Sequence, residues 1–455
     1  MSIVTYLLAV IPVLAAVIVF HELGHYAVAR WCGVKVLRFC LGFGRPIWSR
    51  RFGRDQTEWA IAAFPLGGYV KMLDEREGPV DASEVARAFN RQAVGKRMAI
   101  VVAGPLANFL LAILLYWGLL LHGVPGMRPI VAQPVAGSSA AAAGFEAGET
   151  LTSIAGEAVR DWQEVRLKLL EHAQQVAPVT VEAQNARGEI VARKLDLSKL
   201  APDQVELDIL TPVGLTKAQP RIEPVAAGIV EGGAGALAGL REGDRILSID
   251  DQTIESFDDV VNMVRAAPGK ALHLKLRGQD QVEREVVVTP ERFQEKGTEI
   301  GRMGVKGSIG ETEKERFFIE VRYSIVGALT QGVGRTWETS VFSLKMLGKM
   351  VLGQVSLRNI SGPITIADYA GQSAQHGALA YLNFIALISI SLGILNLLPV
   401  PLLDGGHLMY YVAEVVKGSP VPDRVMEIGQ QIGMVLLFTL MAFALYNDVH
   451  RLVGG

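Results

Sequence analysis

The sequence predicts a polytopic α-helical membrane protein with four transmembrane helices, a re-entrant β-loop and two tandem α/β domains outside the membrane. Half of the 455 residues are hydrophobic, and four apolar runs approach or reach the length that spans a bilayer. A short pattern also occurs twice between the second and third runs. The net charge of −2 indicates no particular partner, and without a basic block nucleic acid is not expected.

The four apolar runs extend from about Ile3 to Ala29, Met98 to Leu121, Leu379 to Leu398 and Ile432 to Tyr446. The first lacks the basic segment that precedes the apolar part of a signal peptide, so we expect it to remain in the protein. The fourth is short for a span. We therefore expect four transmembrane helices.

Basic residues between the first two runs predict the orientation. An excess of Lys and Arg in a loop marks the cytoplasmic side of a membrane. Both termini and the long stretch 122–378 are then expected on the outer side. The basic residues are Arg30, Lys35, Arg38, Arg45, Arg50, Arg51, Arg54, Lys71, Arg76, Arg87, Arg91, Lys96 and Arg97.

The first apolar run contains the pattern H-E-x-x-H, formed by His21, Glu22 and His25. Positions i and i+4 share one face of a helix, so both imidazoles can reach one metal ion, with a carboxylate beside it. Ionisable groups at membrane depth are costly and tend to mark a functional site. The alternative is a pair of polar residues that flank a helix end.

A third ligand is expected after the third run, where two prolines stop the helix and Asp404 follows. Two histidines, one carboxylate and water form a hydrolytic zinc site, with one zinc ion per chain. His407 is the competing third ligand, and Asp404 could instead cap the following helix. Asn396 could hydrogen-bond the substrate backbone or pack between helices.

The loop after the first run combines short β-segments with glycine turns. Irregular backbone near membrane depth is tolerated where protein buries it or it lines a wet cavity, so a re-entrant loop beside the metal is expected. A plain cytoplasmic hairpin is the alternative. The candidate substrate-binding residues are Gly42, Gly44, Gly67, Gly68, Tyr69 and Val70.

The repeated pattern runs from Ala143 to Ile154 and again, 95 residues later, from Ala238 to Ile249. A repeat of this length suits a small globular domain. The pattern A-G-L-x-x-G-D-x-I-x-x-I, intact in the second copy, resembles the PDZ family, which captures extended peptides by strand addition. Phe145 and Glu149 replace the usual Leu and Asp in the first copy. The copies could bind peptide or only screen substrates by bulk.

These features divide the chain into five parts. Residues 1–127 hold the first two spans and the loop, 128–212 and 213–310 the two PDZ-like domains, 311–375 an amphipathic helical region on the membrane surface, and 376–455 the last two spans. Cys32 and Cys40 are the only cysteines, so neither a disulfide scaffold nor a cysteine metal site is expected.

The motifs H-E-L-G-H, G-P-L-A-N, the tandem PDZ-like domains and N-L-L-P-V-P-L-L-D-G-G-H together resemble the site-2 protease family of intramembrane zinc proteases. The resemblance implies His21, His25 and Asp404 on zinc, Glu22 as general base, and the glycine-containing loop as a clamp for substrate. It also implies a bacterial inner-membrane location. The implied substrates are single-pass membrane proteins, notably an anti-sigma factor already trimmed outside, and remnant signal peptides.

Two other function classes compete. A non-catalytic membrane scaffold would use the PDZ-like domains to hold partners but would not need Glu22. A metal transporter would distribute polar residues through several spans, whereas the strong ligands here cluster at one depth.

Overall fold

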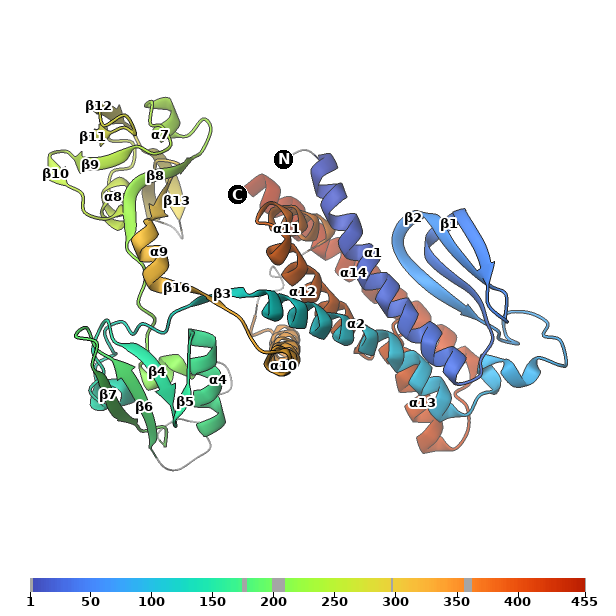
Figure 1. The fold of residues 1–455 in the computed structure, drawn as a ribbon. Helices are drawn as coiled ribbons and strands as arrows, with labels where there is room; N and C mark the ends of the chain where they lie inside the picture. The colour runs from blue at the N-terminus through green and yellow to red at the C-terminus, as the bar shows by residue number, and fades with distance from the viewer. Residues whose placement is uncertain (1–2, 174–177, 199–208, 296–297, 356–361, 455) are drawn as a thin grey trace. The chain divides into compact units, whose positions relative to one another are not determined.

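The computed structural model describes residues 3–173, 178–198, 209–295, 298–355 and 362–454. The chain forms two compact units: unit 1 combines Met1–Val124 with Arg322–Gly455, and unit 2 is Pro125–Val321. Figure 1 accordingly places blue N-terminal and red C-terminal helices together in unit 1.

Unit 1 is mainly helical. Within the described part, four of its helices have the length and composition to cross a membrane. Its elements are α1 (Ile3–Trp31), β1 (Val36–Phe52), β2 (Thr57–Met72), η1 (Val85–Arg87), η2 (Phe89–Arg91), α2 (Val94–His122), α10 (Ile325–Val351), α11 (Pro363–Gln375), α12 (Ala378–Leu397), α13 (Asp404–Lys417) and α14 (Asp423–Gly454).

Helix α2 lies at the centre of unit 1 and contacts α1, α10, α12 and α13. Tyr116 and Leu120 of α2 pack with Ala328 of α10 and Ile390 of α12 in one buried cluster. The predicted surface region 311–375 therefore includes a helix, α10, that packs against the bundle. Residues 356–361 of that region lie outside the described residues.

The fourth apolar run lies within a longer helix. Helix α14 has 32 residues and extends beyond the run at both ends, from Asp423 to Gly454. Asp448 is 1% exposed, and its carboxylate accepts hydrogen bonds from the backbone N–H groups of Gly362 and Ile364, each at 2.9 Å. A polar residue after the apolar run thus ties α14 to the start of α11.

Strands β1 and β2 form a long antiparallel hairpin that folds back on itself. Residues 38–41 of β1 pair with 58–61 of β2 on one side and with 68–71 on the other, while 48–52 pair with 57–61. The hairpin therefore has four runs side by side. Its two edges are the outer run 46–52 and the inner run 68–72, and α1 contacts β2.

Unit 2 contains the two copies of the repeat, and their elements recur in the same order. Copy 1 has β4 (Thr150–Ile154) and α4 (Trp162–His172), and copy 2 has β9 (Arg245–Ile249) and α8 (Phe257–Arg265). Each copy encloses its own buried apolar core. Both helices begin at a side-chain N-cap. The side chains of Asp161 and Ser256 each accept a hydrogen bond from the backbone N–H of the residue three positions later.

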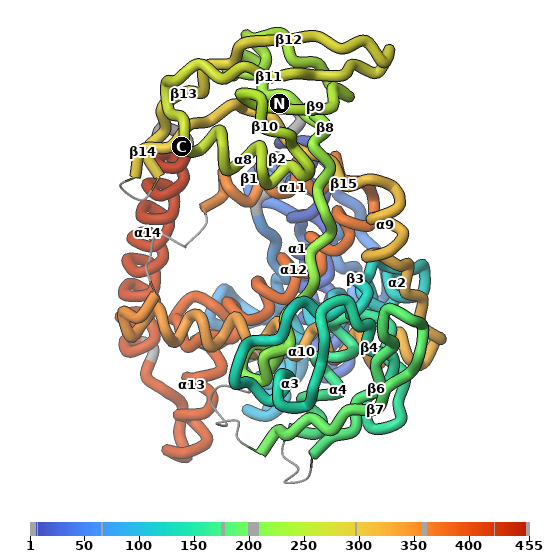
Figure 2. The backbone as a smooth tube through the Cα atoms, turned by 90° about the vertical axis from the view of Figure 1, so that its left-hand side faces the viewer, coloured from blue at the N-terminus to red at the C-terminus, as the bar shows by residue number. Residues whose placement is uncertain are grey.

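The other elements of unit 2 follow the same duplication. Copy 1 forms a sheet in the order β5-β4-β6-β7, and copy 2 one in the order β12-β11-β9-β8-β15; the β11–β12 hairpin is easily followed in Figure 2. The bounds are β3 (Val124–Met127), α3 (Ser139–Ala142), β5 (Glu157–Ala158), β6 (Val179–Gln184), β7 (Ile190–Leu195), α6 (Leu210–Val213), β8 (Ile222–Ile229), α7 (Ala234–Leu237), β10 (Gln252–Thr253), β11 (Leu272–Arg277), β12 (Glu283–Val288), β13 (Glu291–Glu295), β14 (Thr298–Arg302), β15 (Val305–Ile309), α9 (Glu311–Phe317) and β16 (Phe318–Val321).

The unit extends to Val321, beyond the predicted domain end at 310. Phe317 and Val321 are buried, β16 pairs with β3, and the Arg128 N–H donates to the Phe317 carbonyl at 2.7 Å. The chain thus enters and leaves unit 2 through adjacent segments.

Glu149 in copy 1 corresponds to Asp244 in copy 2 and makes the same kinds of contact. Each carboxylate is 2% exposed and pairs with one arginine, Glu149 with Arg193 and Asp244 with Arg284. Each carboxylate also accepts a hydrogen bond from the backbone N–H of the residue three positions earlier. The longer side chain of Glu149 preserves the contacts of the usual Asp, so this substitution keeps the local fold of copy 1.

Candidate metal centre

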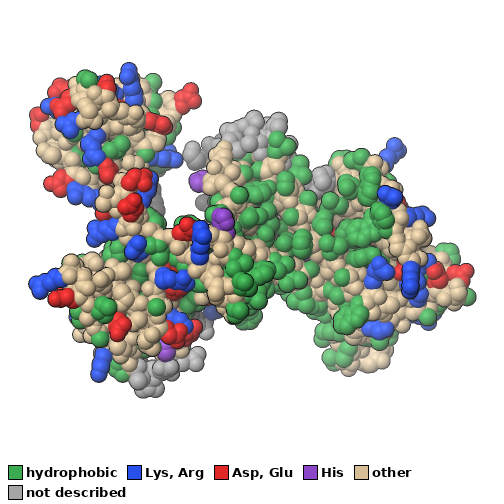
Figure 3. Space-filling view, in the orientation of Figure 1, with side chains coloured by type: hydrophobic (Ala, Val, Ile, Leu, Met, Phe, Trp, Pro, Cys, Tyr) green, Lys and Arg blue, Asp and Glu red, His purple; other side chains and the backbone are tan. Residues whose placement is uncertain are grey.

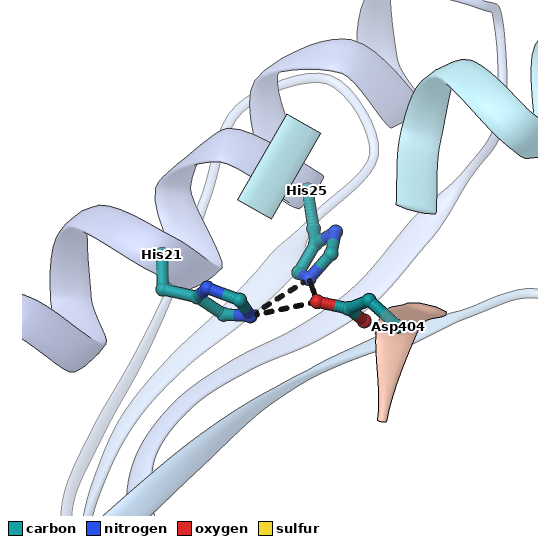
Figure 4. Close-up of side chains that lie close together, drawn as sticks. All are labelled: His21, His25 and Asp404. Carbon is teal, nitrogen blue, oxygen red and sulfur yellow. Dashed lines mark hydrogen bonds and ion pairs between the residues drawn. The ribbon is translucent and has the colours of Figure 1, made fainter. Parts of the chain in front are cut away.

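Helix α1 presents His21 and His25 on one face, one turn apart. Both are nearly buried, with 8% and 9% of their surface exposed. Their Nε2 atoms lie 3.2 Å apart and point toward one another, as Figure 4 shows. Two imidazole nitrogens at this separation can converge on one cation.

Asp404, the first residue of α13, reaches the same point from the other end of the chain. Its Oδ2 lies 3.2 Å from His21 Nε2 and 3.5 Å from His25 Nε2. Among the described residues, His21, His25 and Asp404 form a group that could hold a metal ion, and His407 is not part of it. Leu403, not Asp404, is the N-cap of α13, so the capping alternative does not describe Asp404.

The three donor atoms fit zinc. Ligands bound about 2.0–2.1 Å from a tetrahedral zinc ion lie about 3.3–3.4 Å from one another, which is close to the distances found here. Burial raises the pKa of the Asp404 carboxyl, but the facing imidazoles of His21 and His25 together lower it to about 2. Asp404 is therefore ionised at neutral pH, as a carboxylate ligand must be.

Helix α2 contacts the Nδ1 side of both histidines. His25 Nδ1 lies 2.8 Å from the Ile100 carbonyl oxygen, so Nδ1–H donates to it and leaves Nε2 free. The Asn108 side chain, which is fully buried, places Nδ2 3.2 Å from His21 Nδ1. Asn108 is the last residue of the G-P-L-A-N motif, and its contact with the metal cluster was not predicted from the sequence. A polar residue inside a span was the available signal.

Gly104 allows α2 to approach the cluster this closely. A Cβ at this position would lie 2.4 Å from His25 Nε2 and 2.8 Å from His21 Cε1. Any side chain here would displace the imidazoles, so Gly104 is a second site residue that sequence reasoning missed.

A cavity of about 1260 Å³ borders the cluster, and Glu22 lines it together with His21, His25 and Asp404. Glu22 is half-buried, and no described residue hydrogen-bonds its carboxylate. The inner run of β2 passes directly beside it, since a Cβ on Gly68 would lie 3.1 Å from Glu22 Cγ. The carboxylate is therefore available to a water molecule or a substrate in the cavity.

The predicted substrate-binding residues divide into two groups. Five of them line the cavity: Gly67, Gly68, Tyr69, Val70 and Asn396. Gly42 and Gly44 are not among the residues that line it. Both have positive φ, of 90° and 94°, and they form the bend of β1 around Phe43, so their contribution is to backbone shape.

Comparison with known proteins identifies the class. The model of peptidase family M50 matches residues 9–440, and this chain belongs to that family, the site-2 proteases. With its apolar helices and buried cluster of two histidines and a carboxylate, the protein is an intramembrane zinc metalloprotease.

Three relatives match this chain over nearly its whole length. The chain is 41% identical over 452 residues to the regulator of sigma-E protease RseP of Salmonella typhimurium, which covers 99% of this chain and 100% of that relative. It is 40% identical over 442 residues to RseP of Escherichia coli strain K12, covering 97% and 98%. A putative zinc metalloprotease of Neisseria meningitidis is 40% identical over 454 residues, covering 98% and 99%.

A solved structure is also similar to part of the chain. The PDZ domain of an SdrC-like protein from Listeria monocytogenes matches with 14% identity and a TM-score of 0.17, covering 20% of this chain and 93% of that one. That score is too low to establish a common fold.

Proposed function

We propose that this protein cleaves transmembrane segments of single-pass membrane proteins in regulated intramembrane proteolysis, as an endopeptidase of the bacterial inner membrane. The observation that carries the proposal is the convergence of His21, His25 and Asp404 at a cavity that Glu22 and the inner run of β2 also line. Because relatives are named regulators of sigma-E, the proposed substrates include an anti-sigma factor of an envelope stress response. Remnant signal peptides are proposed as a second substrate class.

In the proposed chemistry, His21, His25 and Asp404 hold one zinc ion per chain. When bound, zinc supplies Lewis acidity to the scissile carbonyl and the attacking water. Glu22 accepts the proton of that water and returns it to the leaving amine nitrogen. The absence of a hydrogen bond from any described residue to the Glu22 carboxylate supports this role.

The inner run of β2 is proposed to bind substrate as an added strand. Peptide bonds in a transmembrane helix are shielded by i to i+4 hydrogen bonds, so the helix must unwind before water can attack. Residues 68–71 pair with β1 on one side, and their other side borders the cavity. An open strand edge offers replacement hydrogen bonds, and Asn396, which lines the same cavity, could bind the substrate backbone.

The proposal also includes the orientation of the chain in the membrane and the role of unit 2. The basic residues of the loop 30–97 favour a cytoplasmic position for the hairpin, with both termini and unit 2 in the periplasm. There, the two PDZ-like copies would exclude substrates whose ectodomain has not been trimmed. Cleavage would then depend on an earlier cut by another protease.

The test of the chemistry is the variant Glu22→Gln. It keeps all three proposed ligands, so purified protein should retain its zinc, measured by elemental analysis, while cleavage falls by roughly 10²–10⁴-fold. Asp404→Asn should lower both zinc content and cleavage, whereas His407→Ala should keep its zinc. Cleavage by Glu22→Gln at a rate near wild type would show that another group acts as base.

A further inference from the structure

The outer half of the hairpin has a composition unlike the rest of the loop. Residues 45–54 contain four arginines and no acidic residue. Every residue from Phe43 to Arg54 is exposed, including Ile47 at 73%, Trp48 at 48% and Phe52 at 44%. We call residues 45–54, which run along the outer edge of the hairpin into the turn between β1 and β2, the hairpin tip.

The arginines of the tip are distinguished by their lack of acidic partners. Arg45, Arg50, Arg51 and Arg54 form no ion pair with any residue that the structure describes. By contrast, six other basic residues of the same loop each pair with a carboxylate: Lys35 with Glu84, Arg38 with Glu58, Lys71 with Glu77, Arg76 with Asp74, Arg87 with Asp55, and Arg91 with Glu75. The positive charge that remains unneutralised in the hairpin is thus concentrated at its tip.

Apolar and basic side chains lie together on the regular part of the tip. Successive side chains of a strand point to opposite faces, so Trp48 and Phe52 share one face with Arg50. Ile47 lies where the pairing with β2 shifts by one residue. In Figure 3, blue Lys and Arg side chains lie among green hydrophobic ones at the hairpin end of unit 1.

Neither hydrocarbon nor bulk water suits this surface. Arginine is costly in the bilayer core, and in bulk water the large apolar side chains of Ile47, Trp48 and Phe52 would remain exposed. The membrane interface accepts both kinds of group, because tryptophan is favoured at the headgroup level and arginine is attracted to anionic lipid. Four exposed arginines without carboxylate partners match the negative charge of phosphate.

We propose that the hairpin tip is a binding site for the phosphate headgroups of anionic phospholipids. Arg45, Arg50, Arg51 and Arg54 bind the phosphates, and Ile47, Trp48 and Phe52 enter the interface. The lipid would hold the outer edge of the hairpin while the inner edge borders the metal cavity. Lipid binding is independent of peptide cleavage, so the two proposals can fail separately.

The first experiment measures which lipids the full-length protein retains. Protein in nanodiscs of phosphatidylcholine and phosphatidylglycerol is released into mild detergent, and native mass spectrometry counts the bound lipids. The wild type should prefer phosphatidylglycerol, and Arg50→Gln, Arg51→Gln and Arg54→Gln should reduce that preference about fivefold per arginine. The matched control is Arg91→Gln, another exposed arginine of the same loop that pairs with Glu75.

Inorganic phosphate distinguishes a lipid site from a simple phosphate site. Phosphate in solution lacks acyl chains, so an excess should leave most phosphatidylglycerol bound. Displacement by phosphate alone would overturn the proposal. Equal lipid retention by the control and by a variant that combines Arg50→Gln, Arg51→Gln and Arg54→Gln would also overturn it. Zinc content of each variant verifies that unit 1 remains folded.

The second experiment locates Trp48. The difference in fluorescence between wild type and Trp48→Phe isolates this residue, and lipids brominated near the headgroup should quench it more than lipids brominated near the chain end. Quenching by aqueous iodide without quenching by brominated lipid would place the tip in water and contradict the proposal. A change in oligomeric mass in the arginine variants, with lipid retention unchanged, would instead identify the outer edge as an interface between two copies.

Discussion

The hydrogen bond at Nδ1 of His21 decides which nitrogen of that imidazole can face a metal. Asn108 Oδ1 is buried without a hydrogen-bond partner among the described residues, while Asn108 Nδ2 lies beside His21 Nδ1. With the amide turned by 180° about its last bond, Oδ1 would accept the Nδ1 proton and leave Nε2 as an acceptor for the metal. This rotation gives Oδ1 a hydrogen-bond partner, and it leaves His21 in the tautomer whose Nε2 can bind a metal.

This orientation predicts that Asn108→Ala lowers zinc affinity by about 10–100-fold, measured by competition with a chelator. Ser389→Ala is the matched control. Its hydroxyl is also buried and donates to the backbone carbonyl oxygen of Asn108 at 2.8 Å, yet it does not touch a histidine. Equal zinc affinities for the two variants would indicate that Asn108 serves packing rather than the metal cluster.

At the scale of elements, the hairpin has one edge at the metal cavity and one edge away from it. The inner run is fixed by side chains as well as by its ladder with β1. Tyr69 accepts a hydrogen bond from Arg38 at 3.2 Å, and its ring stacks on Phe43. An edge held in this way is preorganised for strand addition.

Proline at Tyr69 or Val70 removes one backbone donor, and because successive N–H groups point to alternate sides, one variant affects the ladder and the other the open edge. The variant that keeps a protease-resistant hairpin should keep zinc and cleave less. Substrates with helix-weakening residues near the scissile bond should lose less, because they need less help to unwind. Equal losses for helical and helix-poor substrates would contradict unwinding at this edge.

At the scale of the whole molecule, unit 2 can be removed without cutting through unit 1. The adjacency of Arg128 and Phe317 means that a short linker can replace residues 129–316 while β3 and β16 stay paired. This deletion therefore tests the function of unit 2 while the residues of the metal centre remain in place.

If unit 2 is a gate, this deletion should permit cleavage of a substrate that keeps its full ectodomain, which the intact enzyme should not cut. The measurement compares trimmed and untrimmed forms of one substrate with both enzymes in the same membranes. Loss of cleavage of the trimmed form, in a deletion variant that still binds zinc, would mean that unit 2 recruits substrate instead.

The sequence by itself determined the features that depend on short-range spacing. His21 and His25 share a helix face because they are four residues apart, apolar length predicted the helices α1, α2 and α12, and the duplicated motif revealed the two copies in unit 2. Membership of the site-2 protease family, expected from these motifs together, is confirmed.

Only the tertiary structure decided what depends on contacts between distant residues. It brought Asp404 rather than His407 to the histidines, placed Asn108 and Gly104 behind them, and turned residues 68–72 toward Glu22. It also extended α14 beyond the apolar run at both ends and brought Asp448 to the start of α11. The arginines of the hairpin tip resemble their neighbours in sequence, and only folding supplies carboxylates to some and leaves others without one. Such pairings follow from which elements pack together, and that is a property of the whole fold rather than of any local pattern.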